Sequence, residues 1–243
     1  IFSIIRTHFV LLGLNQVLRR DKTLLNILVH DMATPLTLIS ENIARLKEKL
    51  DGQNFSEVDR ILRSSNKQKD LLMRVRSFHA ANMGKIRIDL LPVSASELIT
   101  ESIALFDEKP MEKDVSFKLE LPKEELYCLT DRITAINNVL GNVIGNAIKF
   151  SEDKCVISIR AFKEKQYIVI EIEDSGTGIS DETLKNLFEE SEITSTKGTK
   201  GEAGTGLGML QIKTFMELYK GSVKIHTSEK GTRVQLYFRS TEI

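Results

Sequence analysis

The chain has 243 residues, of which 41% are hydrophobic and 28% charged, with 34 basic and 34 acidic side chains. This composition supplies a core for one large domain or two ordinary ones, and it excludes a disordered, collagen-like or disulfide-stapled chain. The two cysteines, Cys128 and Cys155, favour a reducing compartment, and the balanced charge gives no indication of nucleic-acid binding.

The two parts of the chain differ in charge and in texture. Residues 1–83 carry 13 Lys and Arg against 8 Asp and Glu, whereas residues 84–243 carry 21 against 26. The charge difference alone is equally compatible with chance. The residue pattern of the sequence also changes at the same place, which favours a domain boundary near residue 84. We therefore expect domains over 1–83 and 94–243, joined by a linker over 84–93.

The N-terminal segment 1–18 is rich in apolar residues but is interrupted by polar and charged ones, among them Arg6 and His8. It is too short and too polar to cross a bilayer, and it lacks the features of a signal peptide. We expect the chain to be a cytoplasmic piece of a longer protein, with any membrane attachment through segments outside it.

Apolar residues recur at seven-residue intervals from Leu11 to Leu46, which is the period of a coiled-coil seam or a helical bundle. The first helix is expected to end at Asp51-Gly52, and a narrower apolar stripe predicts a second helix over 56–83. Two helices alone cannot bury these faces. The hairpin therefore predicts a homodimer that forms a four-helix bundle.

One stretch of the first helix carries chemistry. Pro35 in a helix interior predicts a bend one turn after His30, and Thr34 shares the face of that histidine. Asp31 is adjacent to His30, so its carboxylate can take a proton from an attacking imidazole. Taken alone, these residues fit somewhat better a solvated histidine beside a tolerated kink.

The second part alternates helices and strands. Helices are expected from Ser94 or Ser96 to about Glu108 and over 131–150 and 205–219, and strands over 115–121, 126–129, 156–162, 167–173, 222–227 and 232–238. The strands arrive mostly in hairpins, which predicts an α/β sandwich with a mixed sheet and helices on one face. The fold class of the whole chain is thus α+β, a helical hairpin followed by this sandwich.

Two polar patterns of this part suit a nucleotide. Asn142, Asn146 and Lys149 share one helix face, where amide oxygens can bind Mg²⁺ and the lysine can contact phosphate. Asp174 follows a strand and can accept from an amine, and the glycines after it let a base approach the backbone. A solvated helix face and an ordinary turn explain these patterns equally well.

Two glycine-rich patterns follow. Five glycines lie between Gly198 and Gly208 before a helix, so their N–H groups and the helix N-terminus can receive phosphate. The run matches neither the Walker A motif nor the dinucleotide fingerprint. Gly231-Thr232 by itself indicates only a hairpin.

Taken in order, these pieces resemble the sensor histidine kinases of two-component signalling over residues 20–240. The matches are the phosphoacceptor box from His30 to Pro35, the N box from Asn142 to Ser151, the first glycine box from Asp174 to Ile179, the F box at Leu187-Phe188, the second glycine box from Gly204 to Met209, and the last one at Gly231-Thr232. Each motif is modest, but six in this order and spacing are highly specific.

The resemblance implies a role for each residue of the phosphoacceptor box. His30 would accept the γ-phosphoryl group of ATP and pass it to an aspartate of a response regulator. Asp31 would act as general base at a position where the family often has Glu. Thr34 would position the water that dephosphorylates the regulator.

The resemblance also implies a binding site for ATP and Mg²⁺. Its residues would be Asn142, Asn146, Lys149, Asp174, Gly176, Gly178, Ile179, Phe188, Gly204, Thr205, Gly206, Leu207, Gly208 and Thr232. Asn146 would ligate the metal, Asp174 would hold the adenine amino group, and the glycines from 204 to 208 would seat the phosphates. A mobile lid would run from about 189 to 203. Asn138 stands where the family frequently has Gln.

The implied partners are a second copy of the chain and the receiver domain of a response regulator, without nucleic acid. Two other functions stay open. One is an ATPase of the chaperone, topoisomerase or mismatch-repair type, which would share Asn146 and Asp174 but has no use for the His30 box. The other is a kinase-dead scaffold or a protein acting chiefly as a phosphatase, against which the intact motifs argue.

Overall fold

The computed structural model describes residues 36–43, 45, 58, 60–62, 64–65, 68, 72, 88–107, 113–188, 198–199 and 208–241. The chain divides into two compact units, Ile1–Lys85 and Ile86–Ile243. Among the described residues, no helix is long and apolar enough to cross a membrane.

The first unit is helical at its described residues between 36 and 72. Ser65 is buried there, and its hydroxyl lies 2.7 Å from the Ser40 hydroxyl and donates to the Leu36 carbonyl at 3.4 Å. Helical residues about 25 positions apart in sequence therefore touch, as a hairpin requires. The full hairpin and its dimeric bundle extend over residues outside the described ones and stay predictions.

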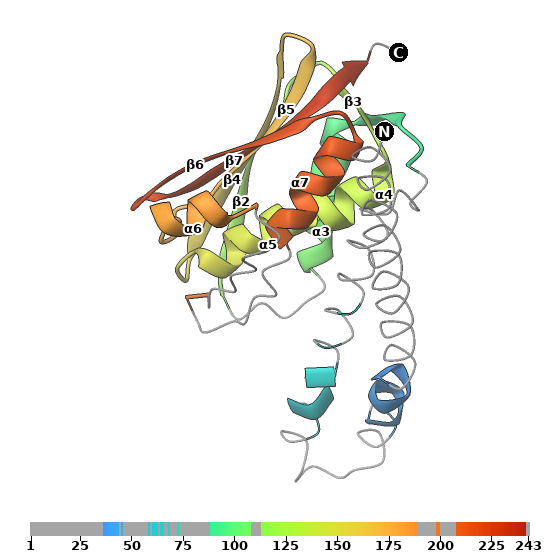
Figure 1. Ribbon diagram of the computed structural model, residues 1–243, viewed down its shortest axis with the longest axis vertical. Coiled ribbons are helices and arrows are strands. Elements are labelled where there is room, and N and C mark those ends of the chain that lie inside the picture. The colour runs from blue at the N-terminus through green and yellow to red at the C-terminus, as the bar shows by residue number, and fades with distance from the viewer. Residues whose placement is uncertain are drawn as a thin grey trace, which may run out of the picture. The chain divides into compact units, whose positions relative to one another are not determined.

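Within its described residues, the second unit forms a seven-stranded sheet with helices (Figure 1). In chain order the elements are β1 (Leu91–Ser94), α3 (Ala95–Asp107), β2 (Val115–Glu120), β3 (Tyr127–Thr130), α4 (Arg132–Thr134), the π-helix η1 (Ala135–Leu140), α5 (Gly141–Phe150), β4 (Cys155–Glu164), β5 (Tyr167–Glu173), α6 (Asp181–Asn186), α7 (Gly208–Leu218), β6 (Ser222–Ser228) and β7 (Gly231–Thr241).

The strands lie in the order β1-β3-β7-β5-β4-β2, with β6 also paired to β7. Strand β2 is parallel to β4, and the other described pairs are antiparallel. The mixed sheet that the hairpin pattern predicts is therefore confirmed.

Two elements differ from the sequence-based expectations. Residues 84–93 were expected to form a linker, but Leu91–Ser94 forms β1 against β3. Only the last two residues of that strand are buried, so its apolar signal is too short to stand out. No helix was expected at Asp181–Asn186, where α6 begins after Ser180, whose hydroxyl accepts from the Thr183 N–H at 3.2 Å.

Helices α3, α5 and α7 cover one face of the sheet (Figure 1). The central strands present aliphatic and aromatic side chains to them at every second position, all at most 7% exposed: Ile157, Ile159, Ala161, Ile168, Ile170, Ile172, Val234, Leu236 and Phe238. Burial of apolar area at about 25 cal/mol per Å² is the main force that holds the two layers together. This core fixes α5 and α7, which carry part of the candidate site.

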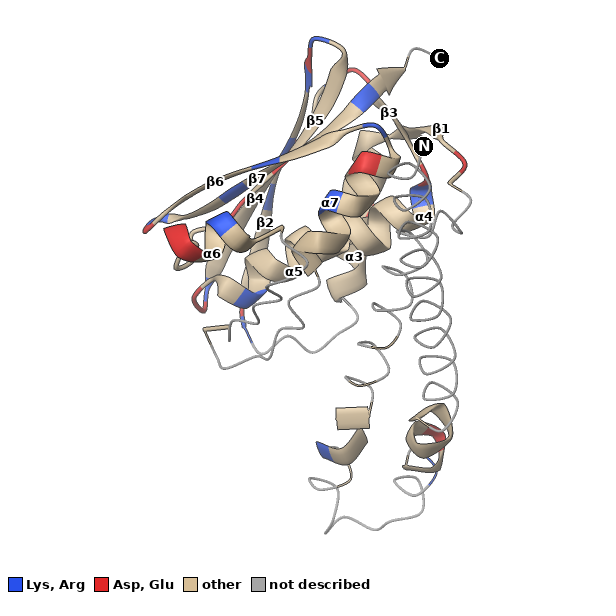
Figure 2. Cartoon of the chain, viewed as in Figure 1, with Lys and Arg blue, Asp and Glu red and all other residues tan. Residues whose placement is uncertain are grey.

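The other face of the central strands carries polar and charged side chains arranged around Glu171. Figure 2 marks the charged positions along these strands. The Glu171 side chain is 2% exposed, and its carboxylate accepts from Arg160 Nε and Gln235 Nε2, both at 2.7 Å. These two residues are its cross-strand neighbours on β4 and β7. Burial raises the pKa of Glu171, but the bonds from Arg160 and Gln235 and the charges of Arg160 and Arg233 outweigh it, so the pKa lies below its ordinary value.

Replacing Glu171 by glutamine should lower the free energy of unfolding of the second unit by about 1–2 kcal/mol at pH 7, since the two arginines lose a buried partner but are themselves half exposed. The folded pKa is depressed, so the ionised carboxylate stabilises the fold fully above its ordinary pKa of 4.5. That stabilisation is lost as the pH falls through the lower folded value. The difference between wild type and variant should therefore shrink in acid.

Urea unfolding followed by tyrosine fluorescence measures this unit, because all four tyrosines lie in it, at 127, 167, 219 and 237. The control is Glu120→Gln, since Glu120 pairs with Lys118 where both side chains are more than half exposed. That variant should unfold like the wild type. An equal loss of stability in both variants, or a loss that does not change with pH, would contradict the role of Glu171.

Candidate functional site

The end of β5 holds a carboxylate between two turns of the chain. Asp174 follows β5 directly, and its N–H donates to the Thr232 carbonyl at 2.9 Å, which extends the pairing of β5 with β7. Its Oδ1 accepts from the N–H groups of Gly176 at 2.9 Å and Thr232 at 3.2 Å. Among the described residues, no donor is bonded to Oδ2. That oxygen is available to accept from a ligand.

Asp174 is partly buried, and its environment acts on its pKa in two directions. Burial raises the pKa above its ordinary value of 3.8, the bonds from Gly176 and Thr232 lower it, and the charge of Glu173 raises it, with a net rise. The carboxylate therefore loses part of its hydration on folding. A ligand that donates a hydrogen bond to the carboxylate would replace the hydration that burial removes.

The loop after Asp174 passes through places that only glycine fits. A Cβ at Gly176 would collide with the Phe150 carbonyl at the end of α5. Gly178 has φ +69°, and a Cβ there would collide with the Ser228 carbonyl. The first glycine box thus lies against α5 on one side and the β6–β7 hairpin on the other, as its sequence pattern requires.

A threonine that the sequence motifs do not include holds this loop to β6. The Thr227 hydroxyl accepts from the Ile179 N–H at 2.8 Å and lies 3.2 Å from the Thr232 hydroxyl. Thr227, Thr232 and Ile179 thus join the first and last glycine boxes. A hydroxyl at an alternate position of a strand has no sequence signal of its own, so it emerges only once the hairpin is formed.

Asn142 is 6% exposed and acts within the protein. Its amide nitrogen donates to the Asn138 carbonyl at 2.7 Å and to Gln211 Oε1 at 3.1 Å. Gln211 is a buried residue of α7 that no motif includes. The structure therefore gives Asn142 a role in joining α5 to α7, and its contact with a nucleotide stays a prediction.

Asn146 is more accessible and lies beside the start of α7. Its amide nitrogen is 3.4 Å from the Met209 sulfur. A Cβ at Gly208 would lie 3.7 Å from the Asn142 amide oxygen and 3.9 Å from the Asn146 amide nitrogen, so α7 begins close to both asparagines. This brings the N box and the end of the second glycine box together.

Two further predicted site residues, Lys149 and Phe188, are half-buried, and each takes part in a contact between a lysine and an aromatic ring. Lys149 Nζ lies 4.6 Å from the Phe150 ring centroid, and Lys213 Nζ lies 5.7 Å from that of Phe188, which follows α6. Each contact is a cation–π arrangement. Neither Lys149 nor Phe188 contacts Asp174 directly in the described interactions.

Several predicted site residues lie outside the described ones: His30, Asp31, Thr34, Gly204, Thr205, Gly206 and Leu207. Their assignment stays a prediction. The candidate site that can be built from the described residues is therefore Asp174 with its two glycine boxes, and the asparagine face of α5 beside Gly208.

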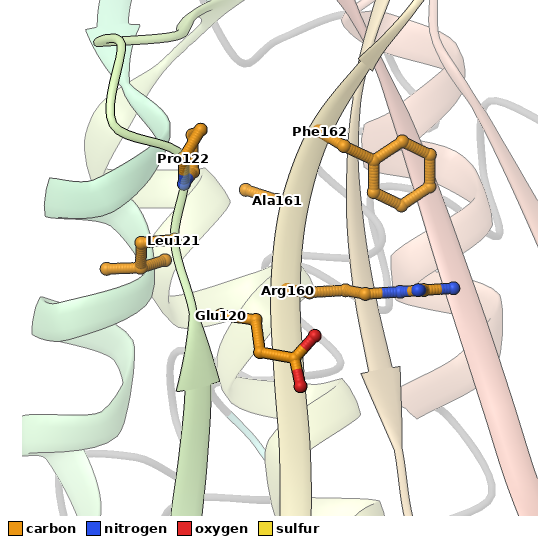
Figure 3. Close-up of a pocket in the computed structure, with 6 residues that line it drawn as sticks. All are labelled: Glu120, Leu121, Pro122, Arg160, Ala161 and Phe162. Carbon is orange, nitrogen blue, oxygen red and sulfur yellow. The ribbon is translucent and has the colours of Figure 1, made fainter.

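A hollow of about 370 Å³ lies elsewhere, where β2 ends beside β4 (Figure 3). Glu120 at the end of β2 and the next two residues, Leu121 and Pro122, line one side, and Arg160, Ala161 and Phe162 of β4 line the other. In Figure 3 the Arg160 and Phe162 side chains extend to the same side of β4, and the guanidinium lies 5.3 Å from the ring centroid. None of these residues belongs to a motif, and the hollow is open.

The family model described as histidine kinase-, DNA gyrase B-, and HSP90-like ATPase matches residues 131–242. The solved structure of full-length ShkA in complex with AMPPNP is similar with a TM-score of 0.72 and 20% identity, over 90% of this chain and 46% of that one. The catalytic domain of histidine kinase ThkA is similar with a TM-score of 0.54 and 25% identity, over 64% of this chain and 97% of that one.

Curated relatives are similar across both units of the chain. The sensor protein RprX of Bacteroides fragilis (strain YCH46) is 24% identical over 92% of this chain and 44% of its own length. The sensor histidine kinase CssS of Bacillus subtilis (strain 168) is 29% identical over 89% of this chain and 46% of its own length. The chain thus spans less than half the length of these two relatives. The motif-based resemblance is confirmed, and the second unit is the catalytic ATP-binding domain of a sensor histidine kinase.

Proposed function

We propose that the chain is the kinase portion of a two-component sensor, which phosphorylates His30 with ATP and passes the phosphoryl group to an aspartate of a response regulator. The observation that carries the proposal is the Asp174 carboxylate, whose Oδ1 is held by N–H groups of two glycine boxes while Oδ2 has no bonded donor among the described residues. The family model also covers gyrase- and HSP90-like ATPases. The named sensor-kinase relatives and the His30 box favour the kinase.

The described residues fit an adenine nucleotide. The Asp174 carboxylate can accept from the exocyclic amine, and Gly176 and Gly178 let the loop after it pack closely against Phe150 and Ser228, which holds the carboxylate in place. The Phe150 carbonyl accepts from the Thr177 N–H at 3.3 Å, which ties this loop to α5. Asn146 lies one helical turn before Phe150, so α5 leads from the adenine side toward the phosphates.

Mg²⁺ also fits the residues present. Asn146 would hold it through the amide oxygen, because the amide nitrogen faces Met209. The N-terminus of α7 at Gly208 lies beside this asparagine and offers backbone N–H groups to phosphate oxygens. Lys149 would add a positive charge. When bound, Mg²⁺ neutralises charge that develops on the phosphates during transfer.

In the proposed reaction a His30 ring nitrogen forms a bond to the γ-phosphorus of ATP, the bond from that phosphorus to the bridging oxygen breaks, and ADP leaves. Asp31 takes the proton that the imidazole loses. The regulator's aspartate then receives the phosphoryl group and His30 is restored. Thr34 orients a water for hydrolysis of the regulator's phosphoaspartate. The helices of residues 11–83 would form the homodimer, in the cytoplasm.

Replacing Asp174 by asparagine should weaken ATP binding by about 1–3 kcal/mol, which is the scale of a lost charge-assisted hydrogen bond. The amide retains the shape but presents a weaker acceptor to the adenine amine. Calorimetry with ATP and Mg²⁺ measures the loss.

The control is Glu164→Gln, an exposed change at the opposite end of the β4–β5 hairpin, which should bind ATP like the wild type. Because burial raises the pKa of Asp174, wild-type affinity should start to fall at a pH above its ordinary value of 3.8, and this component should be absent from the variant. Equal ATP affinity in wild type and Asp174→Asn would reject the adenine site.

Replacing His30 by glutamine should abolish autophosphorylation while ATP binding persists, because the adenine site is built from residues of the second unit. Incubation with ATP labelled at the γ-phosphate, followed by acid treatment, identifies phosphohistidine by its acid lability. His79→Gln is the matched control and should keep the label. Acid-labile label on the His30 variant would overturn the assignment.

Replacing Thr34 by alanine should separate the two activities. The hydroxyl can orient a water but cannot take the imidazole proton as Asp31 can, so autophosphorylation should persist while dephosphorylation of the regulator slows several-fold. Both rates are followed with labelled phosphate, and Thr23→Ala should change neither. An equal loss of both activities would make Thr34 a structural residue of the bend at Pro35.

A further inference from the structure

A buried lysine that belongs to none of the motifs has several hydrogen-bond acceptors around its ammonium group. Lys113, just before β2, is 5% exposed. Its Nζ donates to four oxygens: the carbonyls of Ile148 at 3.0 Å, Lys149 at 2.7 Å and Ser151 at 3.0 Å, and the Thr199 hydroxyl at 2.6 Å. Burial of an ammonium group is costly unless its hydrogens are bonded. Here its three hydrogens are shared among four oxygens.

Three of these oxygens lie at the C-terminal end of α5. The last carbonyls of a helix have no partner within the helix, and they carry the negative end of its dipole. A cation at this position satisfies the carbonyls and is attracted by the dipole. Lys113 is therefore a capping residue of α5 that comes from 35 positions earlier in the chain.

The fourth oxygen belongs to the segment that precedes α7. The Thr199 N–H donates to the Lys149 carbonyl at 3.2 Å, and its hydroxyl donates to the Ser151 carbonyl at 2.7 Å while it accepts from Lys113. Thr199 and Lys113 thus bind the same helix end and each other. Loss of the Lys113 ammonium group would therefore remove a hydrogen-bond partner of Thr199, and loss of the Thr199 hydroxyl would remove one of Lys113.

The same helix end also holds the adenine side of the site. The Phe150 carbonyl, between the carbonyls that Lys113 binds, accepts from Thr177 and closes the space at Gly176. The end of α5 is therefore a junction where the glycine loop after Asp174 and the segment at Thr199 meet. Lys113 bonds the carbonyls on both sides of Phe150.

We propose that Lys113 is a positioning residue of the nucleotide site, which together with Thr199 holds the end of α5 at the Lys149 carbonyl and so keeps Lys149 and Asn146 in place for the phosphates. The proposal rests on the proposed ATP binding. It predicts an effect on the phosphate side of the nucleotide, because the contacts with Asp174 do not involve Lys113 or Thr199.

The test compares ATP with adenosine, which has no phosphates. Lys113→Met removes the donors but keeps the length of the side chain. We expect ATP affinity in the presence of Mg²⁺ to fall about tenfold, which corresponds to about 1.4 kcal/mol, and adenosine affinity to stay unchanged. Binding is followed by NMR titration of the 243-residue chain. The ratio of the two affinities is the readout, since general loosening of the domain would lower both.

A second variant keeps the proposal falsifiable if Lys113→Met does not fold. Thr199→Val leaves the three carbonyl bonds of Lys113 in place and removes the bonds of the Thr199 hydroxyl to Lys113 and to the Ser151 carbonyl. It should lower the ratio of ATP to adenosine affinity in the same way, with unchanged urea unfolding. The matched controls are Lys163→Met and Thr100→Val, both at exposed positions, and they should keep the wild-type ratio.

The outcomes separate the two proposals. If the wild type binds neither ligand, the proposed function is wrong, and the role of Lys113 is wrong with it. If the wild type binds ATP and Thr199→Val keeps the wild-type ratio, the proposed function stands and the positioning role is overturned. The role is also overturned if the variants lose ATP and adenosine affinity in equal proportion.

Discussion

The register between β5 and β7 is the constraint on which the rest of the second unit depends. Seven consecutive residues of β5 are paired with β7, from Tyr167 opposite Arg239 to Glu173 opposite Arg233. Because side chains alternate between the two faces of a sheet, a slip by one residue would turn the isoleucines of β5 away from the helices and bury Glu171 among them. The same register places the Thr232 N–H against the Asp174 carboxylate. Core, charged face and candidate site therefore share one alignment of two strands.

Helix α5 links that alignment to the start of α7. Its buried residues Val143, Ile144 and Ala147 pack in the core, which leaves the asparagine face toward α7. Its last carbonyls accept from groups at three separate places in the chain: Lys113, Thr177 and Thr199. A helix held along its length by the core and at its end by these donors can keep the loop after Asp174 and Asn146 at a fixed separation.

Much of this arrangement could be predicted from the sequence where the signal is local. The strand expected over 167–173, after a charged turn at 163–166, has the bounds of β5. The Asp-x-Gly-x-Gly pattern was enough to place Asp174 at the end of that strand and to require glycines after it. The His30 box is equally local in sequence, but the roles of its residues remain predictions.

The parts that could not be predicted depend on contacts between distant segments. Lys113, Thr227 and Gln211 each bond to residues more than 30 positions away, and none belongs to a recurring pattern. Strand β1 buries too few residues for a period of two to appear. A pattern reports which face of an element is buried, whereas the partner of a single polar group is set by the completed fold.

The candidate site lies where the sequence departs from what its strands and helices would favour. Burial at the end of β5 raises the pKa of Asp174, which means that the charged carboxylate is less stable there than in water. Gly231 and the glycines after Asp174 lose more backbone entropy on folding than other residues would. Asn142 and Asn146 are poorer helix formers than the residues usual in a helix interior. Each departure costs stability. The glycines leave room for the backbone of neighbouring segments, whereas Asp174 and the asparagines present polar atoms. The fold itself requires the glycines and Asn142, whereas the ATP and Mg²⁺ proposed above would account for the polar atoms of Asp174 and Asn146.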